Sequence, residues 1–224
     1  LAEAWQAWAD SQDARGDLAG ARDSLGQALQ VCQRLGMRPA ALCWGIQAQQ
    51  GWLMLQGGKP QDALQLVAPA VQRLRTEAPL SLALAQALAQ MGDALSNVGQ
   101  GTSASRHYDE AMAIRSKLWG PHSVRLAASR EALATALASQ GQLALALQQF
   151  RMSEAALRQT LGATHPSTLH VANKRARLEV RNNLNPASLA DMKRNVARLG
   201  QLDARSDPQR QLDSLLGLAE ALQL

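Results

Sequence analysis

Small and apolar residues recur along the chain at a spacing of about forty residues. Glycines recur 42, 41 and 42 residues apart, at Gly16, Gly58, Gly99 and Gly141. A small residue lies seven positions before each glycine and an alanine five positions after it, which gives Ala9, Gly51, Gly92 and Ala134, then Ala21, Ala63, Ala104 and Ala146. Self-similarity at a fixed period of this length is typical of repeat architectures. The pattern therefore predicts a row of similar structural units.

Each unit is predicted to be two antiparallel helices that meet at the repeating glycine. In the third unit the helices are expected over residues 80–98 and 102–118, and in the fourth over 123–140 and 142–161. Glycine ends a helix readily because it accepts the left-handed conformation. Small residues are needed where two helices cross closely, since a larger side chain would push the backbones apart. The chain has one Phe and one Tyr, so its core must consist mainly of Ala and Leu.

The C-terminal part departs from the period. Residues 167–181 are expected to form one more first-type helix, which the Asn- and Pro-containing segment 182–186 ends. A helix over 187–199 would place Leu189, Met192, Val196 and Leu199 on one face. Asp207 and Pro208 indicate the start of another helix, over 208–222. Because a row of repeats needs an atypical end, residues 183–224 are predicted to form a helical cap.

The repeating positions resemble the tetratricopeptide repeat. Numbered within one repeat, the small residue is eighth, the glycine fifteenth and alanine twentieth and twenty-seventh, while an aromatic residue is twenty-fourth at Tyr108 and Phe150. The period near 42 and the L-G-x-x-H-P-S linker at 161–167 are similar to the longer variant found in kinesin light chains. In the first two repeats, Leu25 and Val67 replace the aromatic residue, but the spacing holds.

The resemblance implies an all-α fold, a right-handed α-solenoid of antiparallel helix pairs that ends in the C-terminal cap. The repeats are expected at about 2–40, 44–79, 85–121 and 127–166, with a half repeat at 167–182.

The resemblance also implies a concave groove lined by the first helix of each repeat. Family positions five, nine, twelve and thirteen give the candidate partner-binding residues Gln6, Asp10, Asp13, Trp52, Gln56, Asp93, Asn97, Glu131, Thr135, Asn173, Arg177 and Arg181. Trp52 is expected to be an anchor, because Trp is over-represented among binding hot spots, or else to pack in the core. Asn97 is expected to bind a peptide backbone, or else to be a solvated residue near a helix end.

Charge is distributed unevenly along this groove. Its acidic residues Asp10, Asp13, Asp93 and Glu131 favour a basic partner segment, whereas Arg177 and Arg181 favour an acidic one. The Lys/Asn carboxylate clamp of chaperone-binding relatives is absent from the matching positions. The basic cluster at 174–181 lacks aromatic residues that could stack on bases, so nucleic acid is not the expected partner.

No catalytic motif, cofactor or metal site is predicted. The chain lacks a Gly-rich phosphate loop, H-E-x-x-H and G-x-S-x-G, and its four histidines are scattered. The linker histidines His122 and His165 are expected to cap helices or bond locally. Cys32 and Cys43 flank the junction of the first two repeats and are predicted to be buried free thiols, with a disulfide as the alternative. No segment is apolar over a length that would span a membrane, and a cytoplasmic location is expected.

These observations predict a non-enzymatic module that binds a protein or peptide in its concave groove. The chain begins at Leu1 and is rich in Ala and Arg, which we interpret as an excised scaffold or sensor part of a larger bacterial signalling or regulatory protein. The alternative is a ligand-sensing regulatory domain that binds a small peptide or metabolite and controls a separate effector domain.

Overall fold

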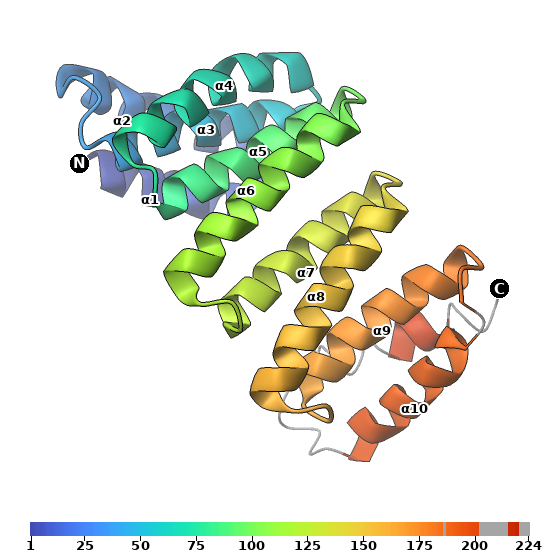
Figure 1. Ribbon diagram of the computed structural model, residues 1–224. Coiled ribbons are helices and arrows are strands. Elements are labelled where there is room, and N and C mark those ends of the chain that lie inside the picture. Colours follow the sequence, from blue (N-terminus) through green and yellow to red (C-terminus); the bar gives the residue numbers. More distant parts are fainter. Residues whose placement is uncertain (186, 202–214, 220–224) are drawn as a thin grey trace. The chain divides into compact units, whose positions relative to one another are not determined.

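The computed structural model describes residues 1–185, 187–201 and 215–219, and within these ranges it is helical without strands (Figure 1). Residues 215–219 are helical, but most of the helix expected over 208–222 and its expected cap Asp207 lie outside the described residues. The labelled helices are α1 (Ala2–Ala14), α2 (Leu18–Arg34), α3 (Ala40–Gln56), α4 (Pro60–Glu77), α5 (Leu82–Asn97), α6 (Gly101–Trp119), α7 (Val124–Ser139), α8 (Leu143–Leu161), α9 (Pro166–Arg181) and α10 (Ser188–Gln201).

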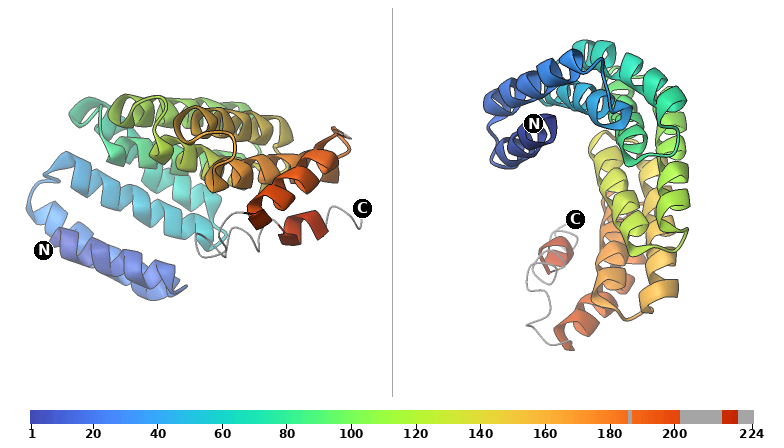
Figure 2. Two further views of the ribbon diagram at one scale, coloured as in Figure 1. Left: turned by 90° about the horizontal axis from the view of Figure 1, so that it is seen from below. Right: turned by 90° about the vertical axis from the view of Figure 1, so that its left-hand side faces the viewer.

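The chain divides into two compact units, Leu1–Leu118 and Trp119–Leu224. Within the first unit, α1 packs on α2 and α3 on α4, and within the second, α7 packs on α8 and α9 on α10 (Figure 1, Figure 2). First helices also meet one another, as α3 and α5 do in the first unit. The predicted all-α fold of antiparallel helix pairs is confirmed.

The period glycines lie where one helix of a pair ends and the other begins. Their φ angles are between +74° and +79°. A residue with a side chain rarely adopts this backbone conformation, which explains why glycine recurs at the tight turn of each pair.

Small residues occupy the places where the two helices of a pair approach most closely. A Cβ atom added to Gly92 would lie 2.5 Å from Cε1 of Tyr108, so the ring on α6 fills the space above α5. A Cβ atom added to Gly51 would meet Cγ2 of Val67 and lie 3.0 Å from the carbonyl oxygen of Ala63. The predicted role of these small positions in packing is confirmed.

We expect Gly92→Ala and Gly51→Ala each to lower the free energy of unfolding by about 1–3 kcal/mol, because the added methyl group overpacks the helix crossing. Gly26→Ala is the matched control. Gly26 is also inside a helix, but an added Cβ there meets nothing within 4 Å. That variant should be about 0.5–1 kcal/mol more stable, since Ala favours the helix. Urea unfolding followed by circular dichroism measures all three, and equal effects at the three positions would contradict the packing explanation.

The core consists mainly of Ala and Leu, as the composition predicted. Tyr108 and Phe150, the two aromatic residues of the repeat pattern, are only 2% and 3% exposed. In the second unit, Phe150 packs in a cluster with Ala127, Ala134 and Val171. Met192 of α10 packs on Ala176 of α9, with Leu218 beside them. The assignment of residues 183–224 as a cap stays a prediction.

Ion pairs join α8 to α9 in the second unit, and a hydrogen bond joins α9 to α10. Glu179 is 2% exposed and accepts hydrogen bonds from Arg175 at 2.7 Å and from the Ser188 hydroxyl at 2.6 Å. Nε of Arg175 also donates to Glu154 of α8 at 2.9 Å. Burial raises the pKa of Glu179, but Ser188 and the arginines outweigh it and hold the pKa below its ordinary value. The buried carboxylate is therefore ionised and fully engaged in holding the three helices together.

The prediction of free thiols at Cys32 and Cys43 was wrong, because the two residues form a disulfide. Cys32 lies in the last turn of α2 and Cys43 in the first turn of α3, and both are fully buried. The intervening turn, which contains Gly36 and Met37 at positive φ, brings their Cα atoms to 5.5 Å. This distance suits a disulfide.

We expect reduction of this disulfide to lower the free energy of unfolding by about 2–3 kcal/mol, the effect of closing a short loop in the unfolded chain. Thermal unfolding with and without dithiothreitol measures the change. The double variant Cys32→Ala, Cys43→Ala is the control and should not respond to the reductant. A wild-type protein that unfolds at the same temperature in both conditions would contradict the prediction.

Candidate partner-binding grooves

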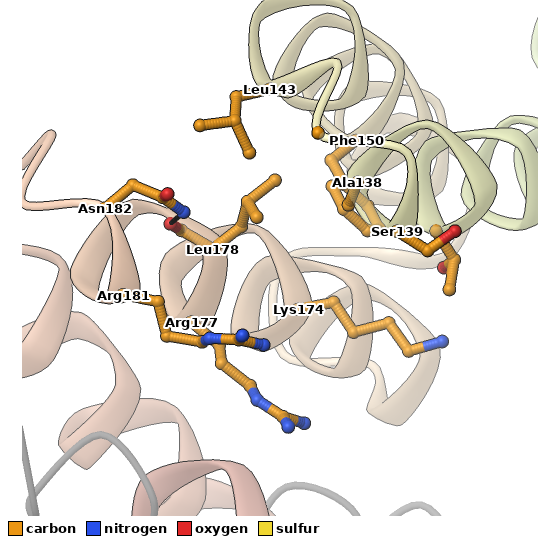
Figure 3. Close-up of a pocket in the computed structure, with 11 residues that line it drawn as sticks. Ala138, Ser139, Leu143, Phe150, Lys174, Arg177, Leu178, Arg181 and Asn182 are labelled. Carbon is orange, nitrogen blue, oxygen red and sulfur yellow. Dashed lines mark hydrogen bonds between the residues drawn. The ribbon is translucent and has the colours of Figure 1, made fainter. Parts of the chain in front are cut away.

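A cavity of about 540 Å³ lies in the second unit between α7, α8 and α9, and we call it the basic cavity. Figure 3 shows the side chains of Lys174, Arg177 and Arg181 extending from α9. Its lining residues are Thr135, Ala138, Ser139, Gly141, Leu143, Phe150, Lys174, Arg177, Leu178, Arg181 and Asn182. The cavity thus combines an apolar surface with hydroxyl groups and cations.

Helical spacing explains why these side chains converge. Positions 174, 177, 178 and 181 lie three or four residues apart and share one face of α9. Positions 135, 138 and 139 do the same on α7. The structure therefore brings together three residues that the sequence placed in the groove, Thr135, Arg177 and Arg181.

Glu131 is not part of the lining of the basic cavity, but it forms an ion pair with Lys174, which is. Its Oε1 accepts a hydrogen bond from Nζ of Lys174 at 2.7 Å and lies 3.3 Å from Nε2 of His170. Burial raises the pKa of Glu131, but the hydrogen bonds and charges of His170 and Lys174 outweigh it and lower the pKa to about 2. Glu131 is therefore a charged positioning group for Lys174.

The two histidines of α9 and its N-cap, His165 and His170, have different environments. Nδ1 of His165 accepts a hydrogen bond from the backbone N–H of Ser167 at 3.2 Å, which caps α9. His170 instead is buried inside α9 and faces Glu131 on α7. Local capping, which the sequence predicted for the linker histidines, is confirmed for His165.

Asn173, another predicted groove residue, does not line the basic cavity. It is 4% exposed, and neither polar atom of its side chain has a hydrogen-bond partner in the described part of the chain. Asn173 therefore points into the packed interior of the second unit.

A second cavity, of about 340 Å³, lies in the first unit between α1, α3 and α5, and we call it the glutamine cavity. Gln6 and Asp10, which the sequence predicted, lie on it. The complete lining is Gln6, Asp10, Ala41, Leu42, Gly45, Gln49, Leu82, Ala83, Gln86 and Gln90.

Gln49, Gln86 and Gln90 were missed by the sequence analysis. Gln49 and Gln90 each lie nine positions before a period glycine, and Lys174 lies two further periods, 84 residues, after Gln90. This register is one residue away from the fifth position that the family pattern supplied. The recurrence of glutamine there in the second and third repeats was the signal that could have found Gln49 and Gln90, whereas Gln86 lies outside this register.

The other candidate residues line neither cavity: Asp13, Trp52, Gln56, Asp93 and Asn97. Trp52 is half-buried against the core cluster around Leu25 and Ile46, as its alternative interpretation expected. Nδ2 of Asn97 donates to the carbonyl oxygen of Asp93 within its own helix at 2.9 Å. These positions are thus less suited to contact a partner in either cavity.

Asp93 has an unusual environment for a carboxyl group. It is half-buried on α5 and accepts a hydrogen bond from the hydroxyl of Tyr108 at 2.7 Å. Burial raises the pKa of Asp93 to about 6, although the hydrogen bond from Tyr108 opposes the change. The folded protein therefore holds a proton on Asp93 more tightly than the unfolded chain does.

This difference in proton affinity makes stability depend on pH. Between about pH 4 and pH 6 the folded state binds more protons at Asp93, so the contribution of Asp93 to stability falls as pH rises through this range. We expect Asp93→Asn to stabilise the protein by about 2 kcal/mol at pH 7.5 and to have little effect at pH 4. Urea unfolding of both proteins at the two pH values measures this, and an equal effect at both would contradict it.

Comparisons with known proteins agree with this helical arrangement. Residues 83–159 match the family model of the tetratricopeptide repeat. Two crystal structures of a protein from Podosopora anserina, described as a kinesin light chain with nearly identical TPR-like repeats, are similar to the chain. The first is 19% identical with a TM-score of 0.71 over 89% of this chain and 94% of that chain. The second is 24% identical with a TM-score of 0.59 over 79% and 84%.

The crystal structure of BtubC (BKLC) from P. vanneervenii is 15% identical, with a TM-score of 0.65 over 92% of this chain and 83% of that chain. No curated protein matches the sequence.

The fold is that of helix-pair repeat proteins. Residues 83–159 match the tetratricopeptide repeat, and the chain has the fold of the kinesin-light-chain-like proteins. A search of the described residues for a helix long and apolar enough to cross the bilayer finds none.

Proposed function

We propose that the chain is a protein- or peptide-binding module and that its basic cavity receives an acidic segment of the partner. Tetratricopeptide repeats generally mediate protein–protein interaction, which supports the first part. The second part is supported by one observation, the convergence of Lys174, Arg177 and Arg181 on a cavity that also offers the hydroxyls of Thr135 and Ser139.

The chemistry of the cavity favours a carboxylate-bearing segment over a neutral one. Arginine presents planar pairs of N–H donors that match a carboxylate. Leu143, Phe150 and Leu178 add an apolar surface for the neighbouring parts of the ligand. In the proposed complex, Glu131 orients Lys174 and the two arginines bind the acidic side chains.

The wider role that we propose is the scaffold or sensor part of a larger bacterial signalling or regulatory protein. The fold supports a scaffold, because stacked repeats present extended binding surfaces. The cavity of about 540 Å³ also falls within the size range of small-ligand sites, which supports the sensor alternative. The two roles differ in whether the ligand must be part of a polypeptide.

We expect the double variant Arg177→Gln, Arg181→Gln to bind a fluorescein-labelled glutamate-rich peptide at least about tenfold more weakly than wild type. Loss of two charge-assisted hydrogen bonds accounts for a change of this size. The matched control is Arg125→Gln, Arg198→Gln, which removes the same charge from exposed sites outside the cavity and should alter affinity about twofold or less. Fluorescence polarisation measures binding, and thermal unfolding confirms that the variants are folded.

Equal losses in both double variants would indicate unspecific attraction and overturn the basic cavity as the site. Equal affinity for a glutamine-rich peptide of the same length would overturn the acidic-segment proposal. Competition by free glutarate as strong as by the glutamate-rich peptide would favour the small-ligand sensor over the peptide-binding module.

A further inference from the structure

The glutamine cavity of the first unit has a lining of opposite character to the basic cavity. Its lining contains one carboxylate, that of Asp10, and no Lys, Arg or His side chain. The remaining polar groups are the four amides of Gln6, Gln49, Gln86 and Gln90. An anion entering this space would meet a negative charge and no cation, so the electrostatics favour a positively charged ligand.

Two hydrogen bonds within the cavity connect its amides to the carboxylate and leave acceptor oxygens open. Nε2 of Gln6 donates to Oε1 of Gln49 at 3.0 Å, and Nε2 of Gln49 donates to Oδ1 of Asp10. This relay fixes the two amides across α1 and α3. The carbonyl oxygen of Gln6 and the second oxygen of Asp10 remain available to accept from a ligand.

Gln90 provides a second, independent observation that points to a ligand in the glutamine cavity. Its side chain lines the cavity and is only 6% exposed, and its Oε1 is buried without a hydrogen-bond partner. Buried acceptors are almost always paired in folded proteins, since an unpaired one costs about 1–3 kcal/mol. The last torsion of a glutamine side chain is soft, so a donor in the cavity can reach this oxygen after a small rotation of the amide.

The walls of the cavity combine a close helix approach with apolar surface. Gly45 and Ala83 keep α3 and α5 close, and a Cβ atom added to Gly45 would lie 3.4 Å from Cβ of Ala83. Leu42 and Leu82 add apolar surface at the same cavity. Lysine and arginine side chains combine a methylene stem with a charged end, and such a stem packs well on apolar surface.

We propose that the glutamine cavity binds an ammonium or guanidinium cation on an alkyl stem, as carried by a lysine or arginine side chain or by a free polyamine. Asp10 pairs with the charge, and the carbonyl oxygens of Gln6 and Gln90 accept the remaining N–H groups. Leu42 and Leu82 contact the stem. This site goes beyond the proposed function, because it lies in the other unit and selects the opposite charge.

The test uses the full chain labelled with ¹⁵N and follows the side-chain amide signals of Gln49 and Gln90 by NMR. The probes are N-acetylarginine methylamide, N-acetyllysine methylamide, the neutral N-acetylglutamine methylamide, and spermidine. We expect the arginine and lysine probes to shift both amide signals in a saturable manner and the neutral probe to shift neither. Asp10→Asn should weaken the binding of the cationic probes about tenfold, since the pairing charge is lost.

Two further variants separate binding from folding. Asp13→Asn removes the same charge from α1 at a position outside the cavity and should change affinity about twofold or less. Gln90→Leu keeps the volume of the side chain, removes the unpaired oxygen and should weaken binding about fivefold while stability is kept or raised.

Equal binding of the neutral probe, or equal losses in Asp10→Asn and Asp13→Asn, would overturn the proposal. Tighter binding of the arginine or lysine probe than of spermidine assigns the site to a side chain of a protein partner, and the reverse order assigns it to a free polyamine. Because none of these variants alters the basic cavity, failure here leaves the glutamate-peptide experiment unaffected, and the two results can be distinguished.

Discussion

The structure depends on the close approach of two helices at small residues. At Gly92 the space that a methyl group would fill is occupied by the ring of Tyr108, and at Gly51 it is occupied by Val67. This contact sets how far apart the two helices of a pair lie and how each first helix is rotated about its axis. The rotation in turn decides which residues of α1, α3 and α5, or of α7 and α9, reach a cavity. The chemistry of the grooves is therefore a consequence of packing between backbones.

The polar interactions that join neighbouring helices differ between the two units. In the first unit, amide-to-amide and amide-to-carboxylate hydrogen bonds cross from α1 to α3 at the cavity itself. In the second unit, carboxylates make the equivalent contacts: the buried Glu179 joins α9 to α10, and the half-buried Glu131 joins α7 to α9. Charged networks of this kind specify geometry more than they add net stability, because desolvation offsets much of the attraction. Their contribution at the basic cavity is to hold Lys174 in place.

The sequence predicted the helices, the turn glycines and the small residues at the helix crossings, because each follows from local physical requirements that repeat with the period. It also predicted that Thr135, Arg177 and Arg181 share a groove, since positions nine and thirteen lie on the inner face. It did not identify Gln49, Gln86 and Gln90 as cavity residues. The candidate positions were taken from the family pattern, and that pattern does not specify how each helix is rotated about its axis. The disulfide was missed for a related reason: whether two cysteines meet depends on the path of the intervening turn, which no periodic pattern encodes.

One repeat position, nine before the period glycine, carries Gln49 and Gln90, and Lys174 lies two further periods along the chain. All three side chains line a cavity, whereas the small residues two positions further along the chain carry the helix packing. Helix packing and cavity lining are thus assigned to separate positions of the same helix turn. A substitution at this position can consequently change the charge of a cavity lining, as between the amide of Gln90 and the ammonium group of Lys174, without altering the residue that packs between the helices. A repeat array with this division of labour can acquire new partners gradually, one repeat at a time, while the remaining repeats keep their existing specificity.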